Sequence, residues 1–250
     1  MRWGTLSADM TLRIFVEAPL AAGSEFELPP GPARHVQVRR LQPGDALRLF
    51  DGRGGEWAAS VAAMGRQSVR VRIGAHHPAE RELPFAVTLA VGMPANERMD
   101  TLVEKATELG VAAIQPLVCA RSVLRLAGER AERKREHWQA VAVAASEQSG
   151  RTRAPRIAPV LALQRWLQGL DAGAACRLLL RPGDGATPLR ESAALAGDCL
   201  GLSGPEGGLT ADEEAAALQR GFSAVGLGPR VLRADTAPLA LLAWLALQHE

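Results

Sequence analysis

The chain has 250 residues, of which 47% are hydrophobic and 22% are charged, so it can bury a substantial core and extensive disorder is excluded. No run approaches the roughly 18 apolar residues of a membrane span, and the first residues lack the apolar segment of a secretory signal. The formal net charge is only +2, so any basic surface must arise from the distribution of charges along the chain.

The first third of the chain shows short apolar runs separated by Gly and Pro turns. These runs predict strands at Leu12–Val16, Ala46–Phe50, Glu56–Ala62 and Ser68–Ile73. Met10 is an alternative start just before the first strand, which would leave the preceding residues as an extension. Closely spaced short strands are typical of a small β-barrel, which we place at residues 11–75. Residues 76–84 are polar and bounded by proline, so we expect a linker there.

Arginine is concentrated in this first third of the chain. Between Gly31 and Ile73 there are eight arginines and only three acidic residues. The planar guanidinium suits phosphate groups and stacks on bases. Only Lys105 and Lys134 are lysines among the 29 basic residues. A GC-rich coding bias explains that ratio equally well, but it does not explain the clustering.

After residue 84 the pattern changes to strands that alternate with helices. A helix capped by Asn96 is predicted by the spacing of Met99, Leu102, Val103, Ala106 and Leu109, and Thr210-Ala211-Asp212-Glu213 is a capping box. We expect strands at Phe85–Val91, Val111–Val118, Cys176–Leu180, Cys199–Ser203 and Ser223–Leu227, and further helices at Glu129–Ser149 and Thr236–Gln248. This alternation predicts an α/β domain with a mostly parallel sheet over residues 85–250.

Three segments of this second part carry glycine or polar residues in places that suggest chemistry. Leu202–Gly208 and Leu227–Ala237 each begin where a predicted strand ends, and ligands of open α/β sheets bind at the carboxyl ends of strands. Ser146–Arg151 ends the long helix. The glycine spacing fits neither a dinucleotide fingerprint nor a P-loop, so a structural turn explains the first loop as well as a binding loop does.

Five segments in order resemble the 16S ribosomal RNA uridine-N3 methyltransferases (the RsmE type), of the knotted SPOUT class. They are Arg98–Val111, Arg121–Val123, Ser146–Arg151, Gly204–Gly208 and Leu227–Ala237, preceded by a matching strand at Arg13–Val16. The resemblance covers about residues 11–250. It departs from the family pattern at Ala120 and Asp235, where the family commonly has Glu, so an essential carboxylate at position 120 is untenable.

The resemblance implies a PUA-like RNA-binding barrel, a trefoil-knotted domain that holds S-adenosylmethionine, and a homodimer that modifies 16S rRNA or the small ribosomal subunit. Carried over by motif, the cofactor-binding residues are Leu180, Leu202, Gly204, Pro205, Glu206, Gly207, Gly208, Leu227, Gly228, Arg230 and Leu232. The catalytic candidates are Arg121, Glu147, Arg151, Glu206 and Arg233. The RNA-binding candidates are Arg13, Arg39, Arg40, Arg70 and Arg72.

Methylation of uridine N3 requires the N3 proton to leave, so a general base would assist, and Glu206 and Glu147 are the candidates. Two alternatives stay open: a ribose 2′-O methyltransferase of the knotted class, and a non-catalytic RNA-binding assembly factor. Cys119, Cys176 and Cys199 are odd in number and form no C-x-x-C pair. We therefore expect free thiols, no metal site and a cytoplasmic protein.

Overall fold

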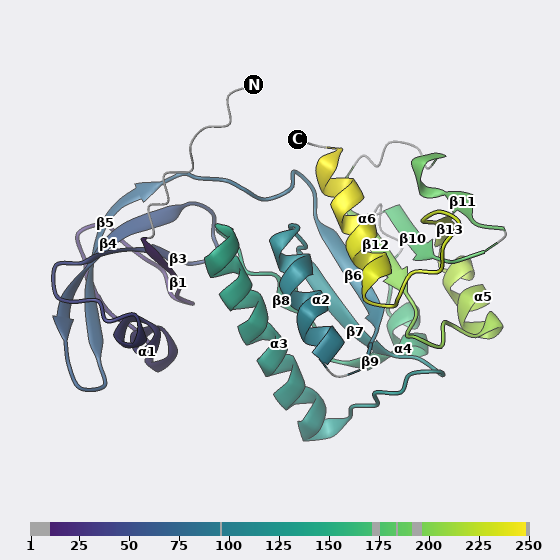
Figure 1. Ribbon diagram of the computed structural model, residues 1–250, viewed down its shortest axis with the longest axis horizontal. Coiled ribbons are helices and arrows are strands. Elements are labelled where there is room, and N and C mark those ends of the chain that lie inside the picture. Colours follow the sequence, from purple (N-terminus) through teal and green to yellow (C-terminus); the bar gives the residue numbers. More distant parts are fainter. Residues whose placement is uncertain (1–10, 96, 172–175, 184, 192–196, 249–250) are drawn as a thin grey trace. The chain divides into compact units, whose positions relative to one another are not determined.

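The computed structural model describes residues 11–248, apart from 96, 172–175, 184 and 192–196 (Figure 1). Met10 and Asn96, the alternative start and the expected helix cap, lie outside the described residues. The chain forms two compact units. The first contains the described residues up to Glu82 together with Ser146–Arg153, and the second contains Leu83–Ala145 and the residues from Ala154 onward.

The first unit is built on one five-stranded sheet with the order β1-β3-β4-β5-β2. β1 is parallel to β3, and the other neighbours are antiparallel. Val69, Val71 and Ile73 point into the core and alternate with outward arginines, as the sequence predicts. The elements are β1 (Leu12–Phe15), β2 (Glu25–Glu27), α1 (Pro30–Val38), β3 (Ala46–Phe50), β4 (Glu56–Met64) and β5 (Val69–His77).

Three features of the first unit differ from the sequence prediction, and one of them is strand β2, which no pattern indicated. Helix α1 was not expected, because Pro29-Pro30-Gly31-Pro32 has the composition of a turn. Pro30 nevertheless begins the helix, since the first helical turn needs no amide partners and proline already has the helical φ. Strand β5 extends to His77, so the first two residues of the expected linker belong to a strand.

The second unit is an eight-stranded sheet in which every pairing is parallel. Its order is β11-β13-β10-β12-β6-β7-β8, with β9 beside β7. This arrangement confirms the α/β fold with a parallel sheet. The strands are β6 (Val87–Gly92), β7 (Ala113–Val118), β8 (Arg156–Ile157), β9 (Leu161–Ala162), β10 (Cys176–Leu180), β11 (Thr187–Pro188), β12 (Cys199–Ser203) and β13 (Ser223–Gly226).

Helices cover both faces of this sheet (Figure 1). In β6, Leu89 and Val91 pack with α2, α3 and α6, whereas Ala90 between them packs with α4 and α5 on the other face. The helices are α2 (Glu97–Glu108), α3 (Gly128–Ser149), α4 (Leu163–Gln168), α5 (Ala211–Gln219) and α6 (Thr236–Leu247), with a short 3-10 turn at Leu189–Glu191. Within the described residues, no helix is long and apolar enough to cross a membrane.

Candidate functional site

Three neighbouring strands of the second unit end at the same level. In the parallel order β12-β10-β13, Leu180 is in register with both Ser203 and Val225. The loops that follow these strands therefore leave the sheet side by side at its carboxyl edge. Ligands of open α/β sheets bind at such an edge, so this is the place to look for a site.

A cavity of about 570 Å³ lies at this edge, which is within the size range of small-molecule sites. A smaller, mainly apolar cavity of about 40 Å³ shares part of its lining, at Leu180, Arg181, Pro182, Leu232 and Ala237. Leu227, Gly228 and Arg230 complete the smaller cavity, and Gly204, Pro205, Glu206 and Gly208 border the larger one. The expected cofactor loops therefore converge, and only Leu202 and Gly207 among the expected residues line neither cavity.

Two positions of the Gly204–Gly208 loop favour glycine, position 204 because of space and position 208 because of backbone conformation. A Cβ atom on Gly204 would lie 2.9 Å from the backbone nitrogen of Leu209 and 3.0 Å from the carbonyl carbon of Gly208. Gly208 has φ of +68°, a conformation that glycine adopts without strain. A Cβ on Gly92 in β6 would lie 2.5 Å from the nitrogen of Pro205. The glycines thus let the loop fold tightly over the strand ends.

Arg121, in the segment that follows β7, makes hydrogen bonds to this loop. Its Nη1 donates to the carbonyl oxygens of Gly207 at 3.0 Å and Leu209 at 3.2 Å. The amide of Ala120 donates to Glu213 Oε1 at 2.7 Å. Glu213 also completes the predicted capping box with Thr210 at the start of α5. Arg121 therefore lines the cavity and holds its glycine loop in place.

Glu206 carries a carboxylate at the rim of the larger cavity. Its Oε1 accepts a hydrogen bond from the amide of Ala95 at 3.0 Å and lies 3.5 Å from Arg98 Nη1. Within the described part of the chain, no interaction is recorded for its Oε2. Glu206 is therefore oriented through one oxygen, and its other oxygen has no recorded partner among the described residues.

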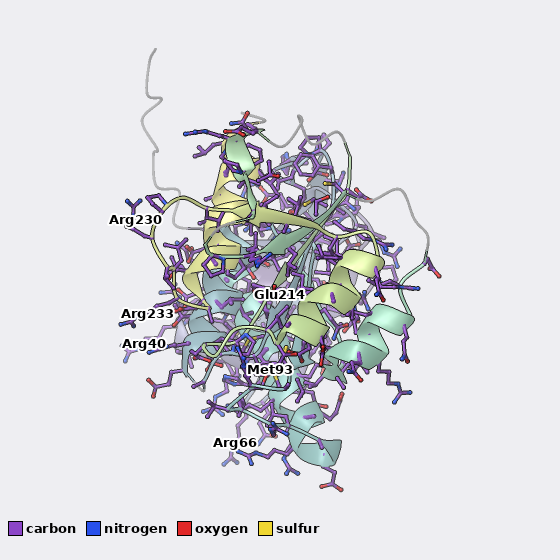
Figure 2. All side chains as sticks on the ribbon, turned by 90° about the vertical axis from the view of Figure 1, so that its right-hand side faces the viewer. Arg40, Arg66, Met93, Glu214, Arg230 and Arg233 are labelled. Atoms are coloured by element: carbon purple, nitrogen blue, oxygen red, sulfur yellow. The ribbon has the colours of Figure 1, made fainter. Side chains whose placement is uncertain are left out.

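Four further charged residues surround the cavities. Arg230 and Arg233 are exposed, and their side chains extend outward from the loop before α6 (Figure 2). Arg181, at the end of β10, and Glu214, on α5, both line the larger cavity, with Arg181 Nε 3.4 Å from Glu214 Oε2. Sequence reasoning did not single out Glu214, because an acid in the first turn of a helix has the pattern of an ordinary solvent-exposed residue.

The other two catalytic candidates, Glu147 and Arg151, belong to the first unit. Glu147 Oε1 accepts from the amide of Phe15 at 3.0 Å, and its Oε2 lies 3.4 Å from His35 Nδ1. Burial raises the pKa of the Glu147 carboxyl. Arg151 is buried and paired with Glu82. Neither residue is among the described residues that line the two cavities. Their side chains instead contact Phe15, His35 and Glu82.

The arginines of the first unit fall into two groups. Arg13 is enclosed: it pairs with Glu56 at 3.1 Å and donates to the carbonyl oxygens of Ser146, Glu147 and Arg151. Arg13 therefore has several protein partners, and its role in RNA binding stays a prediction. The exposed candidates differ among themselves, because Arg70 and Arg72 share the carboxylate of Glu25, whereas Arg39 and Arg40 have no recorded side-chain partner among the described residues.

The thiols and the acidic residues show no sign of a metal centre. Burial raises the pKa of both Cys119 and Cys199 to about 12, so these thiols stay protonated and unreactive. Among the residues that the structure describes, no group of three or more His, Cys, Asp or Glu side chains is placed to hold a metal ion.

Comparisons with known proteins give the class. The family model described as an RNA methyltransferase domain matches residues 81–246, and a model for an RNA methyltransferase PUA domain matches residues 33–74. The chain therefore belongs to the RNA methyltransferase family, which confirms the class and the PUA-like first unit expected from the sequence.

The similar proteins within this family carry a more particular name. Ribosomal RNA small subunit methyltransferase E of Bacillus subtilis is 32% identical over 221 residues, 86% of each chain. That of Mycobacterium tuberculosis is 36% identical over 209 residues, 82% of this chain and 79% of the relative. A crystal structure of the Neisseria gonorrhoeae protein bound to S-adenosyl methionine has a TM-score of 0.89 at 32% identity, covering 95% of this chain and 98% of that one. The resemblance stated from the motifs is confirmed.

Proposed function

We propose that this chain transfers the methyl group of S-adenosylmethionine to N3 of a uridine in 16S ribosomal RNA. The observation that carries the proposal is the cavity at the carboxyl edge of β10, β12 and β13, closed by a loop in which glycine is sterically required. The similarity to small-subunit methyltransferases supplies the substrate.

The residues around the two cavities fit the cofactor. The smaller cavity is bordered by Leu180, Pro182, Leu227 and Leu232, which suit the apolar faces of adenine. Glycines at 204, 208 and 228 border the cavities with their backbone, whose amide groups can donate to ring nitrogens of adenine and whose carbonyl groups can accept from its amino group. Arg181 and Arg230 border the smaller cavity, whereas the acidic side chains, Glu206 and Glu214, border only the larger one, where the polar parts of the cofactor belong.

When bound, S-adenosylmethionine supplies an electrophilic methyl group on a positive sulfonium. The protein has to remove the N3 proton and stabilise the uracil anion, whose charge spreads onto two carbonyl oxygens. We assign proton removal to the free Oε2 of Glu206. Arg233 lines the cavity and has no recorded side-chain partner within the described residues, so it can contact a uracil oxygen or the RNA backbone.

The first unit supplies RNA affinity in this proposal. Arg39 and Arg40 follow helix α1, and their guanidinium groups have no recorded partner in the described part of the chain. Arginine binds phosphate through paired donors. Together with the division of the chain at residues 82 and 83, this supports the expected separation of an RNA-docking part from a methyltransferase part.

A homodimer and a trefoil knot also belong to the proposal. Helix α6 is apolar over its whole length, yet Leu239 and Trp244 are only partly buried and Leu247 is exposed. Apolar surface of this kind suits a second copy of the chain. Light scattering at micromolar concentration should give twice the monomer mass, and a monomer would contradict this part.

A ribosomal substrate would place the protein in the cytoplasm.

Nucleoside analysis tests the reaction. Purified chain is incubated with S-adenosylmethionine and small subunits that lack the modification, and the 16S RNA is then digested to nucleosides. We expect 3-methyluridine in one-to-one proportion with the RNA. A ribose-methylated nucleoside would support the 2′-O reaction instead. If the chain binds the subunits but no methylated nucleoside forms, the non-catalytic reading holds.

A further inference from the structure

One ion pair, between Arg181 and Glu214, lies on the wall of the larger cavity. Arg181 follows β10 directly, and Glu214 lies on α5, so the pair joins two sides of the cavity. Their contact uses Arg181 Nε and Glu214 Oε2, 3.4 Å apart. Within the described residues, neither the terminal nitrogens of Arg181 nor Oε1 of Glu214 has a recorded hydrogen bond. The pair therefore presents unused donors beside an unused acceptor.

The other charged residues of the cavity are used differently. Arg121 donates to two carbonyl oxygens of the glycine loop, and Glu206 is held by Ala95 and Arg98. Arg233 extends outward from its loop (Figure 2). Arg181 and Glu214 are 38% and 28% exposed, so they remain within reach of a ligand in the cavity. In this ion pair, both the basic and the acidic residue line the cavity.

The chemistry of the cofactor matches such a pair. S-Adenosylmethionine has an apolar, aromatic end and an α-amino acid end, which carries a carboxylate and an ammonium on one carbon atom. Leu180, Arg181, Pro182, Leu232 and Ala237 border both cavities. A ligand with its adenine against Leu180, Pro182 and Leu232, which border both cavities, would extend past Arg181 through the larger one. Glu214 borders only that larger cavity.

We propose that Arg181 and Glu214 recognise the amino-acid end of the cofactor: the guanidinium of Arg181 binds its carboxylate, and the carboxylate of Glu214 binds its ammonium. This inference rests on the proposed function. Charge-assisted bonds of this kind, and above all bidentate arginine–carboxylate pairs, are the strong ones. A partly exposed ion pair contributes little to stability, so neutral variants should stay folded.

Calorimetry on the full chain tests the inference with two thioethers that differ only at the end in question. S-Adenosylhomocysteine keeps the amino-acid end, and 5′-methylthioadenosine lacks it. We expect Arg181→Gln and Glu214→Gln each to weaken binding of S-adenosylhomocysteine by about tenfold or more. Binding of 5′-methylthioadenosine should stay within about twofold of the parent, because it makes no contact with the pair. Glu129→Gln, which removes an exposed ion pair with Arg133 on α3, is the matched control.

A third ligand separates the two roles. Decarboxylated S-adenosylmethionine keeps the ammonium but lacks the carboxylate, so Arg181→Gln should not weaken its binding, whereas Glu214→Gln should. The exchanged double variant Arg181→Glu/Glu214→Arg restores an ion pair but reverses its order. We expect it to bind S-adenosylhomocysteine as poorly as the single variants, since each charge would then face the wrong group of the ligand.

Several results would overturn the inference. Equal losses for both thioethers, or full recovery in the exchanged variant, would mean that the pair only supports the cavity wall. Unchanged cofactor binding with weaker RNA binding would assign the pair to the RNA substrate. If the parent chain binds none of these ligands, the proposed function fails as well. Parent binding with unaffected variants removes this inference alone.

Discussion

Two segments that stand out in the sequence have different surroundings in the structure, one beside a cavity and the other within the fold of the first unit. Gly204–Gly208 follows a strand, and Ser146–Arg151 ends a helix, and each carries a glutamate that was a candidate base. Glu206 borders the larger cavity with one carboxylate oxygen unengaged in the described structure. Both oxygens of Glu147 are engaged, by Phe15 and by His35. A carboxylate that is fully engaged in the fold is poorly placed to accept a proton from a substrate.

The difference follows from where each segment lies relative to a parallel sheet. Loops at the carboxyl ends of neighbouring strands converge on one edge, so their side chains meet a shared cavity. At the end of α3, by contrast, the last carbonyl groups need hydrogen-bond donors from outside the helix, because they lack partners within it. Arg13 donates to the carbonyl oxygens of Ser146 and Glu147. A polar motif at a helix end thus serves the fold of the first unit.

The largest effect should separate the two glutamates. Glu206→Gln keeps the shape of the side chain but cannot take the N3 proton, so methyl transfer to the small subunit should fall by about a hundredfold or more. Glu147→Gln should leave the rate within about threefold, because its oxygens serve the fold. Single-turnover methylation at saturating cofactor measures both. Equal losses for the two variants would contradict the distinction.

The next effect concerns the backbone of the glycine loop. Gly204→Ala places a carbon 2.9 Å from the nitrogen of Leu209, so the loop must move and binding of S-adenosylmethionine should weaken by about tenfold to a hundredfold. Gly169→Ala is the control, because its added carbon meets its nearest neighbour at 3.6 Å, an ordinary contact. Calorimetry with both variants decides. Parent-like affinity for Gly204→Ala would sink the assignment of the loop.

A smaller effect distinguishes free arginines from paired ones. The double change Arg39→Gln/Arg40→Gln should weaken RNA binding several-fold and lower the slope of log affinity against log salt by about two, one for each phosphate contact. Arg70→Gln/Arg72→Gln should lower the slope by less than about one, because it also frees Glu25, their shared partner. RNA titrations at several salt concentrations measure the slopes. Equal slopes for both variants would show that the Glu25 pairs do not matter.

The smallest effect is a pH dependence in the first unit. Burial raises the pKa of Glu147 above its ordinary value of 4.5, while His35 and Arg13 face it. The folded state then binds this proton more tightly than the unfolded state. The stability that the group contributes is present below the ordinary pKa and is lost as pH rises through the raised one.

Glu147→Gln removes this titration. The difference in unfolding free energy between variant and parent should therefore move in favour of the variant as pH rises across that window. Urea unfolding at a series of pH values measures it, and Glu136→Gln, elsewhere on α3, serves as the comparison. A shift in the opposite direction would mean that His35 and Arg13 outweigh the burial of the carboxyl.

Local patterns predicted much of the second unit. Cys176–Leu180 and Cys199–Ser203 are strands as expected, and the Thr210 capping box starts α5. These features depend on residues adjacent in the chain, so periodicity and capping chemistry suffice. Local patterns could not predict the contact between Arg181 and Glu214, because it joins the end of a strand to a helix that only the order of the sheet brings near. Helix α1 was missed since proline marks both turns and first helical turns.

Hydrogen exchange tests the central distinction most directly. Amide exchange in the full chain is followed with and without saturating S-adenosylmethionine, and slowing marks the backbone that the ligand orders. We predict slower exchange at residues 204–209 and 227–233, the two loops that contribute residues to the cavities, and unchanged exchange at residues 146–151. Slowing at 146–151 with none at 204–209 would contradict the account, because the cofactor would then bind at the helix end and not at the edge of the sheet.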